Sequence, residues 1–157
     1  MSLKSLLMLG ALLAAATPAS AQPPGKITVG LEVRTEGRAT RDETAAHVEA
    51  DVKVALEAIQ DVAVVPRLQA GRVIWIIVGA GPTAGNSASV VATERYDRGT
   101  LLQLGVRDEG MAERMMLQRI VINHEIFTGK NLQELSTRIV AWVTDNVLVN
   151  VRAAEKR

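Results

Sequence analysis

Residues 73–78 read Val-Ile-Trp-Ile-Ile-Val, six apolar side chains in succession. A run this short and this rich in β-branched residues favours a strand over a helix. Because no polar residue alternates with the apolar ones, the pattern predicts a strand that is covered on both faces or shielded by its neighbours. We therefore expect this strand to lie in the middle of a sheet.

Strand-like segments flank this run on both sides. Upstream, residues 27–34 alternate apolar and polar side chains, which is typical of a strand with one wet face. Three of residues 62–65 are valines, and the run ends at a proline, which favours a short edge strand. Downstream, residues 87–96 follow a glycine-rich stretch and predict a hairpin with the central run, and residues 119–127 fit a further strand.

Two segments carry apolar residues at the three- and four-residue spacing of amphipathic helices. The first is predicted to begin with a capping box, in which the hydroxyl of Thr40 accepts from the amide of Glu43. The second repeats this capping logic at Asn131 and Glu134, and residues 111–118 fit a short helix. The two predicted apolar stripes are Ala45, Val48, Val52, Ala55 and Ile59, and Leu132, Leu135, Ile139, Trp142 and Val143.

The element order is therefore β-α-β-β-β-(β)-α, with helices at both ends of a strand-rich middle. We predict one two-layer α+β domain over residues 27–152, built as a mixed sheet of four to five strands with both helices on one face. This arrangement leaves the other face of the sheet toward solvent or a partner. Residues 153–157 are expected to form a charged tail.

The first residues have the layout of a secretory signal peptide. Lys4 precedes an apolar run over residues 6–16, and Ala19-Ser20-Ala21 supplies small residues for cleavage after Ala21. The run is too short to span a bilayer, so we expect no integral membrane segment after cleavage. Residues 22–26 would form a disordered lead-in, and we expect an exported chain in the bacterial periplasm.

Composition excludes several classes of function. The chain has 157 residues and no cysteine, so disulfides, thiolate metal sites and covalently attached haem are excluded. Eighteen basic and seventeen acidic residues leave no excess positive charge to neutralise phosphates, and aromatic residues make up only 3% of the chain. Nucleic acid is therefore not an expected partner.

No catalytic, cofactor or metal site is predicted from the motifs. The glycine-rich loop at 79–86 lacks the glycine spacing and the following helix of a dinucleotide site. His124 and Glu125 are neighbours in a predicted strand and should point to opposite faces. His47 has carboxylates one turn away at Glu43 and Asp51, a pattern more typical of a solvated helix face than of a metal site.

Two sets of apolar residues are candidates for a partner surface. Met111, Met115 and Met116 lie at one-turn spacing in a polar stretch, and methionine adapts to varied apolar partners. The last predicted helix has further apolar residues that widen its stripe, so part of it can face a second chain. The alternative for both sets is burial in the domain's own core. The residues of this second candidate surface are Val140, Val147, Leu148 and Val151.

The chain resembles the small N-terminal α/β domain of TolB-type periplasmic proteins. The resemblance rests on Val78-Gly79 at the end of the apolar strand, on Tyr96-Asp97-Arg98-Gly99 after the next strand, and on the closing segment 127–146. It extends over residues 40–150 and implies a periplasmic interaction module, because such domains contact other envelope proteins and carry no catalytic centre. We take over the fold from this resemblance and not the partner.

The sequence therefore predicts a small exported, non-enzymatic domain that binds another envelope protein or itself. The alternative is a periplasmic small-molecule carrier, in which the loop at Gly79–Asn86 and the segment Met111–Met116 cover an apolar pocket. An enzyme is a third option, and it would depend on His124.

Overall fold

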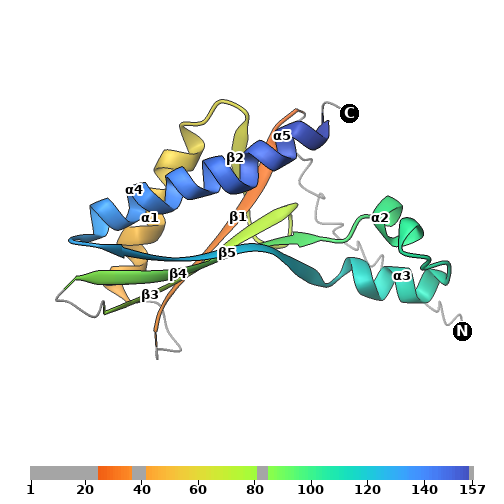
Figure 1. Ribbon diagram of the computed structural model, residues 1–157, viewed down its shortest axis with the longest axis horizontal. Coiled ribbons are helices and arrows are strands. Elements are labelled where there is room, and N and C mark those ends of the chain that lie inside the picture. The colour runs from red at the N-terminus through yellow and green to blue at the C-terminus, as the bar shows by residue number, and fades with distance from the viewer. Residues whose placement is uncertain (1–24, 37–41, 81–84, 156–157) are drawn as a thin grey trace, which may run out of the picture.

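The computed structural model describes residues 25–36, 42–80 and 85–155. They form a five-stranded mixed sheet with helices on one face, which confirms the predicted α+β class (Figure 1). The predicted leader, the lead-in residues 22–24 and part of the predicted glycine loop lie outside the described residues. The elements are β1 (Ile27–Thr35), α1 (Glu43–Glu57), β2 (Val62–Val64), β3 (Arg72–Ala80), β4 (Asn86–Arg95), α2 (Arg98–Gln103), α3 (Glu109–Met116), β5 (Arg119–Gly129), α4 (Leu132–Trp142), η1 (Val143–Leu148) and α5 (Val149–Glu155).

The strand order across the sheet is β2-β1-β3-β4-β5. β1 runs parallel to β2 and β3, whereas β3, β4 and β5 form an antiparallel meander. The apolar run at 73–78 lies in the middle strand, and residues 62–64 form an edge strand, both as predicted. The other edge is β5, whose pairing with β4 is interrupted by a bulge at Ala92 and Thr93.

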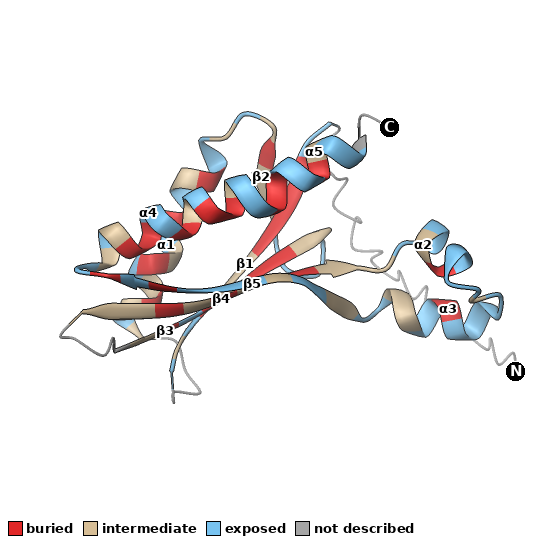
Figure 2. Ribbon diagram, in the orientation of Figure 1, coloured by how far each residue is buried: buried red, intermediate tan, exposed pale blue. Residues whose placement is uncertain are grey.

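Helices α1 and α4 pack side by side on one face of the sheet, and the core lies between them and the strands (Figures 1 and 2). Both predicted stripes face this core, although in α1 the fourth buried position is Leu56 rather than Ala55. Phe127 of β5 meets Trp142 of α4 edge to face, with ring centroids 6.0 Å apart. Edge-to-face packing is a favoured geometry for aromatic rings.

Helix α1 has its N-cap two residues later than predicted. Its N-cap is Asp42, whose side chain accepts from the amide of Ala45 and also receives the hydroxyl of Thr35. Aspartate and threonine are both good N-caps, so the sequence pattern alone did not decide between them. The predicted cap, Thr40, lies outside the described residues.

The C-terminal helix is continuous from α4 through η1 to α5, and η1 is a π-helical segment (Figure 1). The amide of Val149 donates to the carbonyl of Thr144, five residues back. At about 100° per residue, a regular α-helix would carry Leu148 on the side opposite Ile139. One extra residue in the π turn returns Val147, Leu148 and Val151 to the core stripe, where all three are buried.

This burial corrects one of the predicted partner surfaces. Val147, Leu148 and Val151 are 1%, 0% and 5% exposed, and Val140 is half-buried against the same core. The apparent widening of the apolar stripe comes from the π turn, which changes the helical period over a few residues. These side chains are therefore core residues of this domain and not part of a docking surface.

The central strand is covered on both faces only along half of its length. On the face away from the helices, Val73 is buried and Trp75 half-buried, but Ile77 is 47% exposed. The connection between β2 and β3 covers the first half, and the guanidinium of Arg67 lies 5.4 Å from the centroid of the Trp75 ring. The prediction of a strand covered on both faces is therefore wrong at Ile77. Among the described residues, no segment covers Ile77 in the way that the connection between β2 and β3 covers Trp75.

No helix among the described residues is long and apolar enough to cross a membrane.

An ion pair connects the C-terminal helix to the rest of the domain. Both Nε and Nη2 of Arg152 in α5 donate to the carboxylate of Asp61, each at 2.7 Å. The hydrogen bonds from Arg152 lower the pKa of Asp61 below its usual 3.8.

This ion pair predicts a specific pH dependence of stability. Because the folded-state pKa of Asp61 is depressed, its contribution is present above about pH 3.8 and is lost as the pH falls below that value. We expect Arg152→Gln to destabilise the protein at pH 7, with the difference from the wild type shrinking below about pH 3.8. Urea unfolding between pH 7 and pH 2 measures this difference.

The control is Arg107→Gln, because Arg107 has no ion pair among the described residues. Its difference from the wild type should stay constant with pH. A constant difference for Arg152→Gln as well would contradict the assigned role of the Asp61 pair.

Candidate functional site

Among the described residues, four exposed apolar side chains belong to a helical arm that projects from one end of the sheet. The arm consists of α2, α3 and their connections, and it extends away from the body where β4 ends and β5 begins (Figure 1). Leu101 and Ala112 form its small buried centre. An arm with so few buried positions cannot bury all of its other apolar side chains.

Local capping explains why the arm folds into two short helices. Asp97 caps α2 by accepting from the amide and the hydroxyl of Thr100, and these bonds lower the pKa of its carboxyl group. Asp108 caps α3 by accepting from the amide of Met111 at 2.7 Å. Between the helices, Gly105 has a φ of +81°, a backbone conformation that favours glycine and ends α2.

Exposed apolar side chains continue from the arm along the edge strand β5. Among the described residues, eleven large hydrophobic side chains are exposed, and seven of them lie between residues 102 and 126. Scattered single residues of this kind are ordinary, but a concentration in one stretch marks an interaction surface. They are Leu102 (54% exposed), Leu104 (62%), Met111 (48%), Leu117 (82%), Val121 (62%), Ile122 (39%) and Ile126 (70%).

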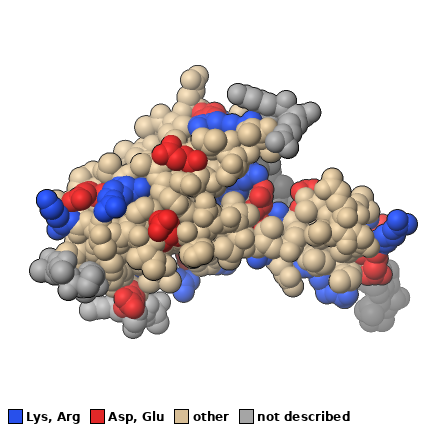
Figure 3. Space-filling model, in the orientation of Figure 1, with Lys and Arg blue, Asp and Glu red and all other residues tan. Residues whose placement is uncertain are grey.

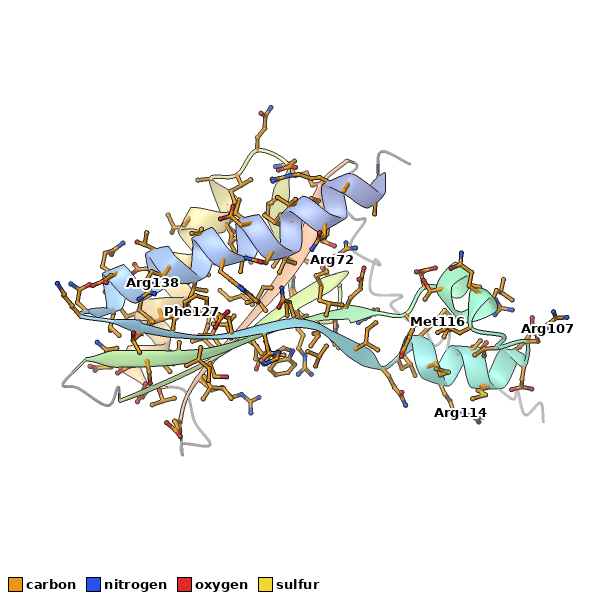
Figure 4. All side chains as sticks on the ribbon, viewed as in Figure 1. Arg72, Arg107, Arg114, Met116, Phe127 and Arg138 are labelled. Atoms are coloured by element: carbon orange, nitrogen blue, oxygen red, sulfur yellow. The ribbon has the colours of Figure 1, made fainter. Side chains whose placement is uncertain are left out.

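The methionines predicted as a partner surface lie in this arm. Met111 is exposed, whereas Met115 and Met116 are half-buried. Figure 4 places Met116 at the root of the arm and Arg107 toward its far end. In the view of Figure 3, much of the near side of the arm is uncharged, with charged side chains around its rim. The leucines beside the methionines were missed, because in the sequence they are equally compatible with a buried strand.

The second part of the site is the face of the sheet that the helices do not cover, which we call the open face. At one end of this face, a hollow of about 460 Å³ is lined by Arg34, Glu36, Ile77 and Ile126, together with serines of β4. At the other end, the connection between β2 and β3 closes the surface. Arg119 fixes that connection by donating to the carbonyls of Arg67, Ala70 and Gly71.

The edge strand is already protected against pairing with another strand. The amide of His124 donates to the side chain of Asn123 at 2.9 Å, and the amide of Ile126 donates to the side chain of Glu125 at 3.1 Å. Natural proteins often obstruct the edge strands of their sheets, which prevents uncontrolled pairing with strands of other chains. Docking at this edge is therefore expected to use side chains rather than an added strand.

The two histidines are placed as the sequence suggested. His124 aligns with Val91 and Glu125 with Val90, so the two side chains leave opposite faces of β5. The Nε2 of His47 lies 3.4 Å from a carboxylate oxygen of Asp51, on the exposed surface of α1. In the described part of the chain, no group of three histidine or carboxylate side chains is arranged to hold a metal ion.

The structure separates the two segments of the predicted carrier pocket. Residues 79, 80, 85 and 86 lie where β3 ends and β4 begins, while Met111–Met116 lies beyond the other end of β4. A strand of ten residues is about 33 Å long, so the described ends of the loop lie far from the methionine segment. Residues 81–84 of the loop lie outside the described residues.

Comparison with known proteins identifies no family for this chain. No family model matches the sequence, and no curated protein matches it. Among solved structures, the chain is similar to a PelC dodecamer from Paraburkholderia phytofirmans, with 16% sequence identity and a TM-score of 0.41. The match covers 78% of this chain and 90% of that one. An overlap this loose assigns neither a fold family nor a function.

Proposed function

We propose that this chain is a small non-catalytic binding module of the bacterial cell envelope that docks another protein chain on its arm and open face. The observation that carries the proposal is the set of exposed apolar side chains on the arm, which Val121 and Ile126 continue on the open face. The signal-peptide pattern in residues 1–21 supports export to the periplasm. The resemblance to TolB-type N-terminal domains supports an interaction role.

The arm supplies a sizeable part of the driving force. Burying a large aliphatic side chain completely is worth about 1.5–3 kcal/mol. Leu102, Leu104, Met111 and Leu117 are each about half to four-fifths exposed, so they contribute about 4–7 kcal/mol before the cost of association. This corresponds to weak binding at best, so the proposal also requires the apolar groups of the open face.

Substitutions on the arm test the docking surface. We expect Leu104→Lys and Leu117→Lys to weaken association with the partner at least about 30-fold each, since burying a charge at an apolar contact costs about 2 kcal/mol or more. Both positions are helix C-caps, where a lysine suits the helix dipole and should leave the fold intact. The partner is another envelope protein or a second copy of this chain.

A photo-crosslinking amino acid at Leu117, introduced in the producing cell, identifies the chain that docks there. The matched control is the same amino acid at Val54, which is 67% exposed on α1, away from the arm. We expect a discrete crosslinked product from Leu117 that disappears when Leu104→Lys is added, and none from Val54. Equal crosslinking at both positions, together with a monomer in sedimentation, would refute the proposal.

A further inference from the structure

A second concave site lies on the opposite side of the sheet from the open face. It is a cleft of about 360 Å³ between the C-terminal helix and the ends of β3, β4 and β5. Its polar wall includes Arg72, Glu94, Asn146 and Asn150, and its apolar wall includes Ile120 and Val151. Pockets for small ligands start at about 300 Å³, so the cleft has room for a small molecule only.

The cleft contains an ion pair with unused hydrogen-bonding capacity. Nη2 of Arg72 donates to one carboxylate oxygen of Glu94. A guanidinium can donate five hydrogen bonds. Nε of Arg72 is buried without a hydrogen-bond partner among the described residues, so the Nη groups are the part of this guanidinium that a ligand in the cleft could reach. The other two charged residues that line the cleft are engaged elsewhere, because Arg95 donates to the carbonyl of Leu68 and Asp97 caps α2. Arg72 and Glu94 are thus the two charged residues of the cleft that, among the described residues, make side-chain hydrogen bonds only to each other.

The π turn brings two amides to the same cleft. In a regular α-helix, Asn146 and Asn150 would lie within about 20° of Ile139, in the centre of the core stripe. The extra residue in η1 turns both side chains away from the core, and both line the cleft. Each amide nitrogen donates to a carbonyl four residues back, which leaves the amide oxygen as an acceptor for a ligand. π-turns of this kind are frequent at functional sites.

We infer that this cleft binds a small zwitterion, namely a free amino acid or a dipeptide with an aliphatic side chain. The carboxylate of the ligand would be held by the guanidinium of Arg72, and its ammonium group by the carboxylate of Glu94 and the oxygen of Asn150. A purely anionic ligand would be repelled by Glu94, and a purely cationic one by Arg72. The aliphatic side chain of the ligand would lie against Ile120 and Val151.

The test is a ligand titration of the purified chain followed by amide NMR shifts. We expect L-leucine or leucyl-leucine to shift amides of residues 94–97 and 146–151 in a saturable way. N-acetyl-leucine lacks the ammonium group and leucinamide lacks the carboxylate, so both should bind at least about tenfold weaker. Absence of saturable shifts up to about 10 mM of either zwitterion would overturn the inference, as would equal binding of N-acetyl-leucine.

Variants locate the binding within the cleft. Arg72→Met and Glu94→Gln should each weaken binding of the zwitterion at least about tenfold. The matched control is Glu32→Gln, which breaks a similar arginine–glutamate pair with Arg34 on the open face and should leave binding unchanged. If Arg72→Met fails to fold, Glu94→Gln and Asn150→Leu still test the site. Unchanged binding in these cleft variants would overturn the inference. The outcome is independent of partner docking, because the titration uses the purified chain alone and the cleft positions Arg72, Glu94 and Asn150 lie on neither the arm nor the open face.

Discussion

Replacing Trp142 with alanine is expected to lower the free energy of unfolding by about 3–5 kcal/mol, the usual cost of removing a buried aromatic side chain. Trp142 is 8% exposed, and it packs against Phe127 across the interface between α4 and the edge strand. Domains of this size are stable by about 5–15 kcal/mol in total, so the variant should lose between about a fifth and all of its stability. Urea titration followed by far-UV circular dichroism measures the change.

The control for this substitution is Val54→Ala on the outer face of α1. Val54 is 67% exposed, and surface substitutions usually change stability by no more than about 0.5 kcal/mol. A loss below about 1 kcal/mol in Trp142→Ala would show that the C-terminal helix contributes little to the core. It would also remove the support for the described packing of α4 against β5.

Deleting single residues from the C-terminal helix is expected to give opposite results in α4 and in η1. Deleting Thr137 from the regular helix rotates every later residue by about 100° and takes Ile139, Trp142 and Leu148 out of the core, so this variant should not fold. Deleting Asp145 removes the extra residue of the π turn and leaves the core stripe in phase. We expect this second variant to fold, with a stability within about 2 kcal/mol of the wild type.

Thr137 and Asp145 are both exposed, so neither deletion removes a core side chain directly. Circular dichroism and thermal melting of the two variants provide the comparison. Folding of the Thr137 deletion, or unfolding of the Asp145 deletion, would contradict the assignment of η1 as a one-residue insertion.

Much of the element order could be predicted from local patterns. Alternation identified residues 27–34 as a strand, although Thr28 and Gly30 on its predicted wet face are buried under the connection between β2 and β3. The stripe at Leu135, Ile139 and Trp142 identified the last helix, because one-sided burial imposes the helical period on the sequence. The arm was predicted only in part. A short helix from Met111 was expected, but residues 98–103 carry too few apolar residues to show a helical period.

The candidate sites depended on long-range contacts and could be predicted less well. The valines and leucine of η1 fitted a partner surface because a reading at 3.6 residues per turn spreads them around the helix. The signal for the π turn was present in the four-residue spacing of Ile139, Val143, Val147 and Val151. The ion pair of Arg72 and Glu94 had no local signal at all, since it joins residues of neighbouring strands 22 positions apart.

The sequence by itself determined the α+β class, the central position of residues 73–78 and the absence of cysteine chemistry. These properties follow from side-chain period and composition, which act within a few residues. Only the tertiary structure decided that Leu148 is buried, that Leu117 is exposed, and that Arg72 and Asn150 share a cleft. The physical reason is that the exposure of a side chain, and its distance from residues far away in the sequence, depend on how distant segments pack. A repeating local pattern does not say which distant segment covers a given side chain.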